Sequence, residues 1–199
     1  MTGSAVDFRR LFQVCLLVPD IDAATRAMSE ASGLTFAEPW SYDNLVYWTP
    51  RGNVTTSRIR VTYSHQGPQH FELIQPTPGG FFDVSERRSP HHVGLWSDHV
   101  GTETAELVRA GWTVEAAAVS PEEGYGRVSF VRPPGGGTLL EIVSTQILRP
   151  RGQAAGRPHR LSASATAAAR AVASACDAVD GLAAVFIGRR HENLARLAG

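Results

Sequence analysis

Four polar residues stand in apolar segments where their side chains could do chemistry. Gln13 and His92 lie near the start of short apolar runs, and Glu72 and Glu141 each lie between apolar neighbours. A carboxylate that is buried without a partner costs free energy, so each glutamate must either face solvent or meet a partner. Carboxylate, amide and imidazole groups are ligands for divalent metals, so a metal ion could be that partner.

The elements that must position these residues occur twice in the chain. The first copy is predicted as a strand over 12–18, a helix over 21–31 and strands over 44–49, 57–63 and 70–75. The second copy is predicted as a strand over 92–96, a helix over 101–110 and strands over 113–118, 126–132 and 138–144. The apolar spacing therefore predicts two βαβββ modules, and such a duplication is stronger evidence than a single motif.

The four polar residues fall at equivalent places in the two copies. The run that begins at Gln13 aligns with the run that begins at His92, and Glu141 stands where Glu72 stands in the first copy. One glutamate alone would be interpreted as a solvent-facing residue on an alternating strand. Two at matching positions, with Gln13 and His92 on the partner strands, favour a shared site.

The sequence contains common signals for helix ends and for a connecting segment between the modules. Asp20 is expected to cap the first helix, and Gly33 is expected to end it. The segment 75–89 contains prolines and glycines and is predicted to connect the modules. Together these signals predict one domain over 10–146, with module one over about 10–76 and module two over about 90–146.

A different composition follows this domain. Residues 147–160 are predicted as a linker and 161–199 as a helical C-terminal extension. In the extension, apolar residues recur at helical spacing from Ala168 to Val179. Such a stripe must bury against the main domain or against a second subunit.

The composition excludes several classes of function. The 199 residues carry a formal net charge of zero, which argues against a general nucleic-acid binder. No run approaches the roughly 20 apolar residues of a membrane-spanning helix, and no signal-peptide core is present. Cys15 and Cys176 show no motif spacing, which is typical of free thiols in a reducing compartment. A cytoplasmic protein without a membrane partner is expected.

The duplicated pattern resembles the vicinal oxygen chelate superfamily. This superfamily includes glyoxalase I, methylmalonyl-CoA epimerase, extradiol dioxygenases and bleomycin-resistance proteins. The resemblance covers about residues 10–146, and the segments that fit its pattern are 18–21, 71–76, 91–94 and 140–142. It implies an α+β fold in which two βαβββ modules form a cupped mixed β-sheet with flanking helices, followed here by a C-terminal helical tail.

The resemblance also implies a set of metal ligands. By the ligand positions of the superfamily, a divalent ion would be held by Gln13, Glu72, His92 and Glu141. The sequence does not distinguish Zn, Ni, Co, Mn and Mg as that cofactor. His91 is then expected to point to the opposite face of its strand.

A first-strand glutamine with two glutamates and one histidine is similar to glyoxalase I of the eukaryotic type. The resemblance implies a metal-dependent isomerase or lyase that catalyses a proton shift, isomerisation or elimination next to a carbonyl through a metal-stabilised enolate. Glu141 would be the catalytic base, with Glu72 as its partner across the site. The alternatives are a resistance-type protein of the same fold that binds a small molecule without catalysis, and a scaffold protein that acts through its C-terminal helices.

Four further residues are candidates for substrate binding. Arg58 and Arg60 share one strand face and could hold a carboxylate or phosphate, or could line a solvated face. Tyr47 and Trp96 are candidate aromatic contacts. The expected partners are a small-molecule substrate with two adjacent oxygens and a second copy of the chain in a homodimer.

Overall fold

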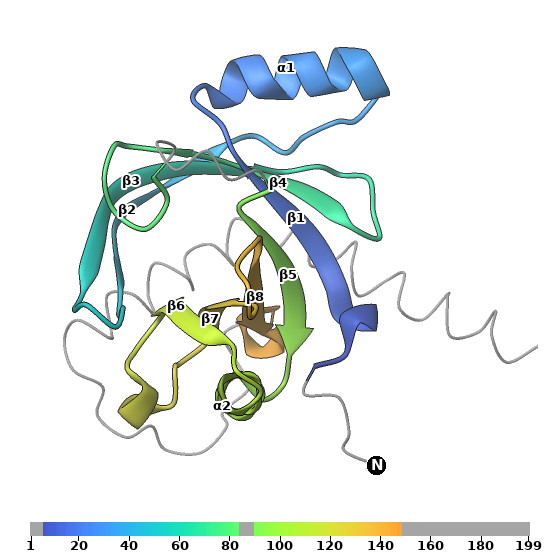
Figure 1. The fold of residues 1–199 in the computed structure, drawn as a ribbon. Helices are drawn as coiled ribbons and strands as arrows, with labels where there is room; N and C mark the ends of the chain where they lie inside the picture. The colour runs from blue at the N-terminus through green and yellow to red at the C-terminus, as the bar shows by residue number, and fades with distance from the viewer. Residues whose placement is uncertain (1–5, 84–89, 149–199) are drawn as a thin grey trace, which may run out of the picture.

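A computed structural model describes residues 6–83 and 90–148 of the chain. In these residues eight strands form a single curled mixed sheet, and the two α-helices lie on its outer side (Figure 1). The α+β fold of two βαβββ modules that the sequence predicts is therefore confirmed. The predicted linker after residue 148 and the helical extension lie outside the described residues.

The elements follow the predicted order. Module one contains β1 (Leu11–Leu17), α1 (Ile21–Ser32), β2 (Trp40–Tyr47), β3 (Val54–Tyr63) and β4 (His70–Pro76). Module two contains β5 (His92–Ser97), α2 (Val100–Arg109), β6 (Thr113–Ala117), β7 (Val128–Arg132) and β8 (Leu139–Ser144). Short 3-10 helices occur at Phe8–Arg10, Pro121–Glu123 and Thr145–Leu148.

The largest boundary error concerns β2, which was predicted over 44–49. The strand starts earlier, at Trp40, because the residues from Trp40 onwards pair with β3. The first pair is Trp40 with Val61 and the last is Tyr47 with Val54. It ends earlier because Thr49 and Gly52 exchange backbone hydrogen bonds of 3.2 and 3.0 Å and form a turn. Pairing with a neighbouring strand, which the sequence does not display, sets these boundaries.

The ends of α1 confirm the predicted signals. Asp20 accepts a hydrogen bond of 2.9 Å at its Oδ1 atom from the backbone N–H of Ala23. At the other end Gly33 has a positive φ of 73°, and its N–H donates to the carbonyl of Ser29. A carboxylate at the N-cap and a left-handed glycine at the C-cap satisfy backbone groups that the helix leaves unpaired.

The strand order is β2-β3-β4-β1-β5-β8-β7-β6, so the modules meet where β1 pairs with β5. In this antiparallel pair Gln13 lies opposite Gly94, and Cys15 lies opposite His92. The register is symmetric about Val14 and Val93, which relates the modules by a pseudo-two-fold axis. Both modules belong to one chain and share one sheet.

The far edges of the sheet also meet. Trp48, just after β2, and Ala117, at the end of β6, exchange two backbone hydrogen bonds of 2.9 Å. This bridge joins the two edge strands, so the sheet curls back on itself as Figure 1 shows. The curl creates an inner face and an outer face with different packing.

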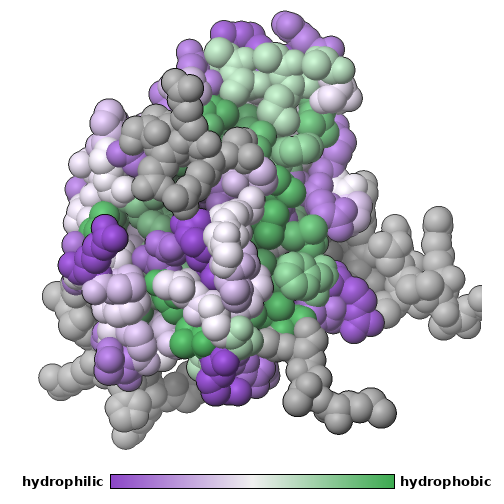
Figure 2. Space-filling model, in the orientation of Figure 1, coloured by the Kyte–Doolittle hydropathy of each residue, from purple (hydrophilic) through white to green (hydrophobic). Residues whose placement is uncertain are grey.

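Two hydrophobic clusters cover these faces. The inner cluster combines residues from both modules with Phe82 from the connecting segment, and its central rings include Tyr47 and Phe130. The outer cluster packs Leu95, Leu140 and neighbouring side chains beneath α2. In the space-filling view apolar side chains gather in a band that runs downwards from α1 (Figure 2). Among the described residues, no helix has the length and apolar character needed to cross a membrane.

Candidate metal centre

Four side chains from the four central strands converge on the inner face. Gln13 Nε2 lies 2.7 Å from Glu141 Oε2 and 3.1 Å from both Glu72 Oε2 and His92 Nε2. His92 Nε2 lies 3.0 Å from Glu72 Oε2 and 3.3 Å from Glu141 Oε2. We call these four residues the tetrad. The structure thus brings together all four residues that the sequence suggested as ligands.

The strand register explains this convergence. In the parallel pair of β1 and β4, Cys15 lies beside Glu72, and in the pair of β5 and β8, Gly94 lies beside Glu141. Cys15 and Gly94 are equivalent positions, so the glutamates occupy equivalent places around the pseudo-two-fold axis. Since side chains two apart on a strand share a face, the tetrad faces inwards from both modules.

Gly94 gives the Gln13 side chain its space. A Cβ atom at Gly94 would lie 2.6 Å from Cγ of Gln13 and 2.9 Å from Cε1 of Phe12. These distances are too short for unbonded carbon atoms, so a glycine is needed opposite Gln13. The predicted site residues do not include Gly94, although a glycine inside a strand is a recognised signal of a close approach.

The tetrad is withdrawn from solvent. The side chain of His92 is 1% exposed, whereas that of Glu72 is 7% and that of Glu141 is 12% exposed. Burial raises the pKa of the Glu141 carboxyl above its usual range, although His92 opposes this shift. Burial alone would lower the pKa of His92, but neighbouring Cys15 and Glu141 raise that pKa well above its usual range. The four side chains therefore meet in a site that excludes most of the solvent.

Tyr63 orients one of the two carboxylates. Its hydroxyl donates a hydrogen bond to Oε1 of Glu72, and burial together with Glu72 raises the pKa of Tyr63. Tyr63 therefore remains a donor, and the other oxygen of Glu72 is the one that faces Gln13 and His92. The only sequence feature that hints at this contact is an aromatic residue on the neighbouring strand.

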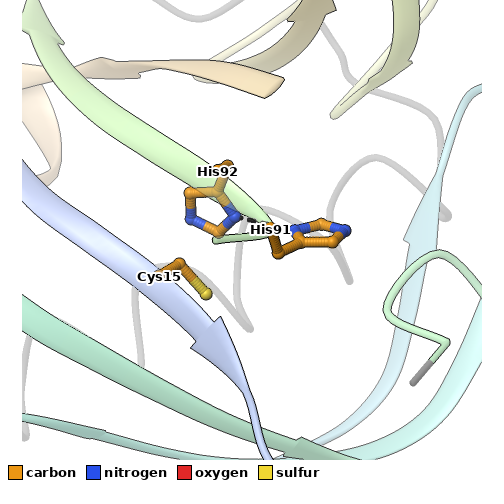
Figure 3. Close-up of side chains that lie close together, drawn as sticks. All are labelled: Cys15, His91 and His92. Atoms are coloured by element: carbon orange, nitrogen blue, oxygen red, sulfur yellow. Dashed lines mark hydrogen bonds between the residues drawn. The ribbon is translucent and has the colours of Figure 1, made fainter. Parts of the chain in front are cut away.

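The expectation that His91 points away from the site is wrong. His91 Nδ1 lies 2.9 Å from His92 Nδ1, and the two rings meet at 77° (Figure 3). The ligand atoms of His91, His92 and Cys15 all lie within 4.8 Å of one another. His91 precedes the first residue of β5, so strict strand alternation does not govern its side chain.

The substrate-binding candidates occupy different places. Arg58 pairs with Asp43 at 2.6 Å, and Arg60 pairs with Asp22 at 2.8 Å. Arg58 and Arg60 flank Ile59, whose side chain belongs to the inner cluster. Because neighbouring side chains on a strand point to opposite faces, both arginines lie on the outer face of β3. This arrangement places them on the opposite side of the sheet from the tetrad.

The aromatic candidates are directed inwards. Tyr47 is buried in the inner cluster, with its ring centroid 5.7 Å from that of Phe130. Trp96 is partly buried and stacks on Phe12 at 3.9 Å. Phe130 in turn contacts the His92 ring at a centroid distance of 5.3 Å. Aromatic rings therefore adjoin the tetrad on the inner face.

Comparison with protein families identifies the fold family. The sequence model described as glyoxalase/bleomycin resistance protein/dioxygenase superfamily matches residues 12–130. The chain belongs to this superfamily. A search of curated protein sequences found no match. The match includes Gln13, Glu72 and His92 and ends before Glu141.

Solved structures with a similar fold include two epimerases and a synthase. Methylmalonyl-CoA epimerase from Mycobacterium tuberculosis is 13% identical, with a TM-score of 0.45 over 67% of this chain and 86% of that chain. A variant of the Streptomyces coelicolor epimerase in complex with 2-nitronate-propionyl-CoA is 14% identical, with a TM-score of 0.43 over 68% and 96%. A mutant of 4-hydroxymandelate synthase from Streptomyces coelicolor is 15% identical, with a TM-score of 0.46 over 83% of this chain and 54% of that chain.

The tetrad of this superfamily member fits a divalent metal ion in two respects. Ligand atoms about 2.1 Å from one ion and at right angles to each other are about 3 Å apart, close to the distances within the tetrad. In addition, Oε1 of Gln13 is buried without a hydrogen-bond partner, while Nε2 donates to the two glutamates. A cation among these atoms would favour the opposite orientation of the amide, in which Oε1 faces the ion.

Proposed function

We propose that this chain is a metal-dependent enzyme that moves a proton at a carbon next to a carbonyl group. The observation that carries the proposal is the convergence of Gln13, Glu72, His92 and Glu141 at distances of 2.7–3.3 Å in a buried site. A buried pair of carboxylates with one imidazole and one amide has no evident structural use, because apolar residues would pack there at lower cost.

The four residues would hold a divalent ion through Oε1 of Gln13, one oxygen of each glutamate and Nε2 of His92. When bound, such an ion supplies Lewis acidity that stabilises negative charge on a substrate oxygen. Tyr63 supports this arrangement, since it engages the oxygen of Glu72 that faces away from His92. A substrate with two adjacent oxygens suits a site of this kind.

Glu141 is the better candidate for the base. Its side chain is more exposed than that of Glu72, and burial raises its pKa, which makes its carboxylate a stronger base. Glu72 is held by the Tyr63 hydroxyl and is less free to leave its position. Glu141 would take the proton from the substrate carbon and return it to the same carbon or to a neighbouring one, which gives epimerisation or isomerisation.

The test combines metal analysis with one substitution. Protein purified without chelators should contain about one equivalent of a divalent metal, or should take it up from added Zn, Ni, Co or Mn. Glu141→Gln should abolish turnover of any substrate that the wild type converts while the fold is retained. A wild-type protein that takes up less than about a tenth of an equivalent would contradict the proposal.

The aromatic inner face favours one second candidate, a protein that sequesters a small aromatic molecule. Tyr47, Phe81, Phe82 and Phe130 contact one another at centroid distances of 4.7–6.0 Å. Apolar rings with a few polar groups are typical of binding sites for small molecules. A metal-free protein that binds an aromatic ligand tightly and leaves it unchanged would support this function instead.

A further inference from the structure

His92 lies between two groups of polar atoms. Its Nε2 atom belongs to the tetrad, whereas its Nδ1 atom lies 2.9 Å from Nδ1 of His91. Figure 3 shows the two histidine rings next to each other with the Cys15 sulfur beside them. The proposed function explains the first group and leaves the second without a role.

The contact between the two rings constrains their protons. A nitrogen–nitrogen distance of 2.9 Å is a hydrogen bond, so one Nδ1 atom must donate and the other must accept. If His91 donated, a neutral His92 would carry its own proton on Nε2, directed at Glu72 and Glu141. The Nε2 atom would then have no lone pair available to coordinate a metal ion.

We infer that His91 is a positioning residue for the metal site, because its Nδ1 accepts the Nδ1 proton of His92 and keeps His92 Nε2 directed at the tetrad. The inference rests on the proposed metal site. Histidine ligands commonly donate their second ring N–H to a carboxylate, a carbonyl or a water molecule. In this chain the residue immediately before the ligand takes that role.

The surroundings of His91 hold it in place for this role. Its backbone N–H donates to the carbonyl of Cys15 at 2.9 Å, and its carbonyl accepts from Leu139 N at 3.2 Å. These bonds fix the His91 backbone between β1 and β8. Its ring contacts Phe81 and Phe82 at centroid distances of 5.5 and 5.4 Å. Both the backbone and the ring are therefore constrained.

Cys15 offers a competing acceptor for His92, since its sulfur lies within 4.8 Å of a ligand atom of each histidine. It is fully buried, opposite His92 in the pair of β1 and β5. A protonated thiol is a weak hydrogen-bond acceptor, whereas an unprotonated imidazole nitrogen is a strong one. The histidine is therefore the better partner, and Cys15→Ala serves as the matched control.

Two substitutions at His91 separate positioning from packing. His91→Phe keeps a ring against Phe81 and Phe82 but removes the acceptor. His91→Asn loses the ring but places an amide oxygen near the former Nδ1. We expect His91→Phe to weaken Zn²⁺ affinity by about tenfold to hundredfold, measured by competition with a chelator. The affinities of His91→Asn and Cys15→Ala should stay close to that of the wild type.

A purely structural role predicts the opposite order. The ring variant His91→Phe would then keep its Zn²⁺ affinity, and His91→Asn would lose it together with stability. The inference would be overturned if His91→Phe kept its Zn²⁺ affinity and His91→Asn lost it. It would also be overturned if both variants lost Zn²⁺ affinity equally, or if neither variant lost any. A large loss in Cys15→Ala would also overturn it, since the sulfur would then be the acceptor.

A second measurement decides the question without metal. In metal-free protein, nitrogen-15 NMR should show a slowly exchanging Nδ1 proton on His92 in the wild type and in His91→Asn. The same resonance should be lost in His91→Phe. If the wild type takes up no Zn²⁺, the proposed function fails, but this resonance still tests the hydrogen bond. Its absence from the wild type, or its persistence in His91→Phe, would refute the role of His91.

Discussion

At the scale of single residues, the site depends on four side chains and on the neighbours that orient them. Tyr63 directs Glu72, and Gly94 leaves room for Gln13. Buried polar groups of this kind must be fully partnered, because each one without a partner destabilises the fold. The unpartnered Oε1 atom of Gln13 is the exception within the tetrad, and a bound cation would resolve it.

The protonation of the site predicts how metal affinity depends on pH. The pKa values of His92 and Glu141 both lie above their usual ranges, so a metal ion must compete with protons for these ligands over a wider range of pH than it would for free side chains. Affinity should therefore weaken as the pH falls and strengthen as it rises towards those pKa values. Calorimetric titration with Zn²⁺ in buffers of different ionisation enthalpy measures the protons released. Zn²⁺ affinity that stays constant between about pH 6 and 8, with no proton release, would contradict this prediction.

Gly94 lies where a larger side chain has no space. In Gly94→Ala the new methyl group would overlap Gln13 and Phe12, so either the Gln13 side chain or the strand must shift. We expect the free energy of unfolding to fall by about 1–3 kcal/mol and Zn²⁺ affinity to fall with it. Urea denaturation and metal competition measure the two effects.

Val93→Ala is the matched control for this substitution. Val93 lies on the same strand but packs against the outer cluster, so its truncation should reduce stability and leave Zn²⁺ affinity unchanged. Equal effects of the two variants on metal affinity would show that Gly94 has no particular role at the site.

At the scale of the elements, the duplication made most of the architecture predictable. The spacing of apolar residues predicted every strand and both helices of the described residues. This works because a strand or helix that packs against the core repeats its apolar residues with the period of its own backbone. The matching positions of Glu72 and Glu141 also indicated that the four side chains of the tetrad lie close together. Equivalent residues that face a pseudo-two-fold axis lie close together in space. The repeat in the sequence therefore indicated which residues are neighbours in the fold.

Other features of the site could not be predicted in this way. The position of His91 depends on the bend of the chain before β5, and the Tyr63 contact depends on the register between β3 and β4. The outward direction of Arg58 and Arg60 depends on which face of β3 turns inwards. A two-residue spacing shows that side chains share a face but does not show which face it is.

In the whole molecule, one curled sheet contains every strand of the described residues. The sheet, both helices and all four tetrad residues lie between residues 6 and 148. Both modules contribute to one site through the pairing of β1 with β5. In this structure all four tetrad residues therefore come from one chain.

The contacts of the tetrad predict the effect of truncation. A chain that ends after residue 148 should unfold cooperatively and bind Zn²⁺ with the affinity of the full chain, because no described contact of the tetrad involves later residues. Circular dichroism during urea denaturation and metal competition check both properties. Loss of Zn²⁺ binding in a folded truncated chain would assign part of the site to the C-terminal extension.

The central claim is that Gln13, Glu72, His92 and Glu141 together hold one divalent ion. The most direct measurement is a crystal structure of the protein grown with Zn²⁺, with anomalous diffraction recorded on both sides of the zinc absorption edge. We expect one anomalous peak about 2.0–2.2 Å from ligand atoms of all four residues, with the Gln13 amide turned so that Oε1 faces the ion. A peak beside Cys15 and His91, or no peak at the tetrad, would contradict it.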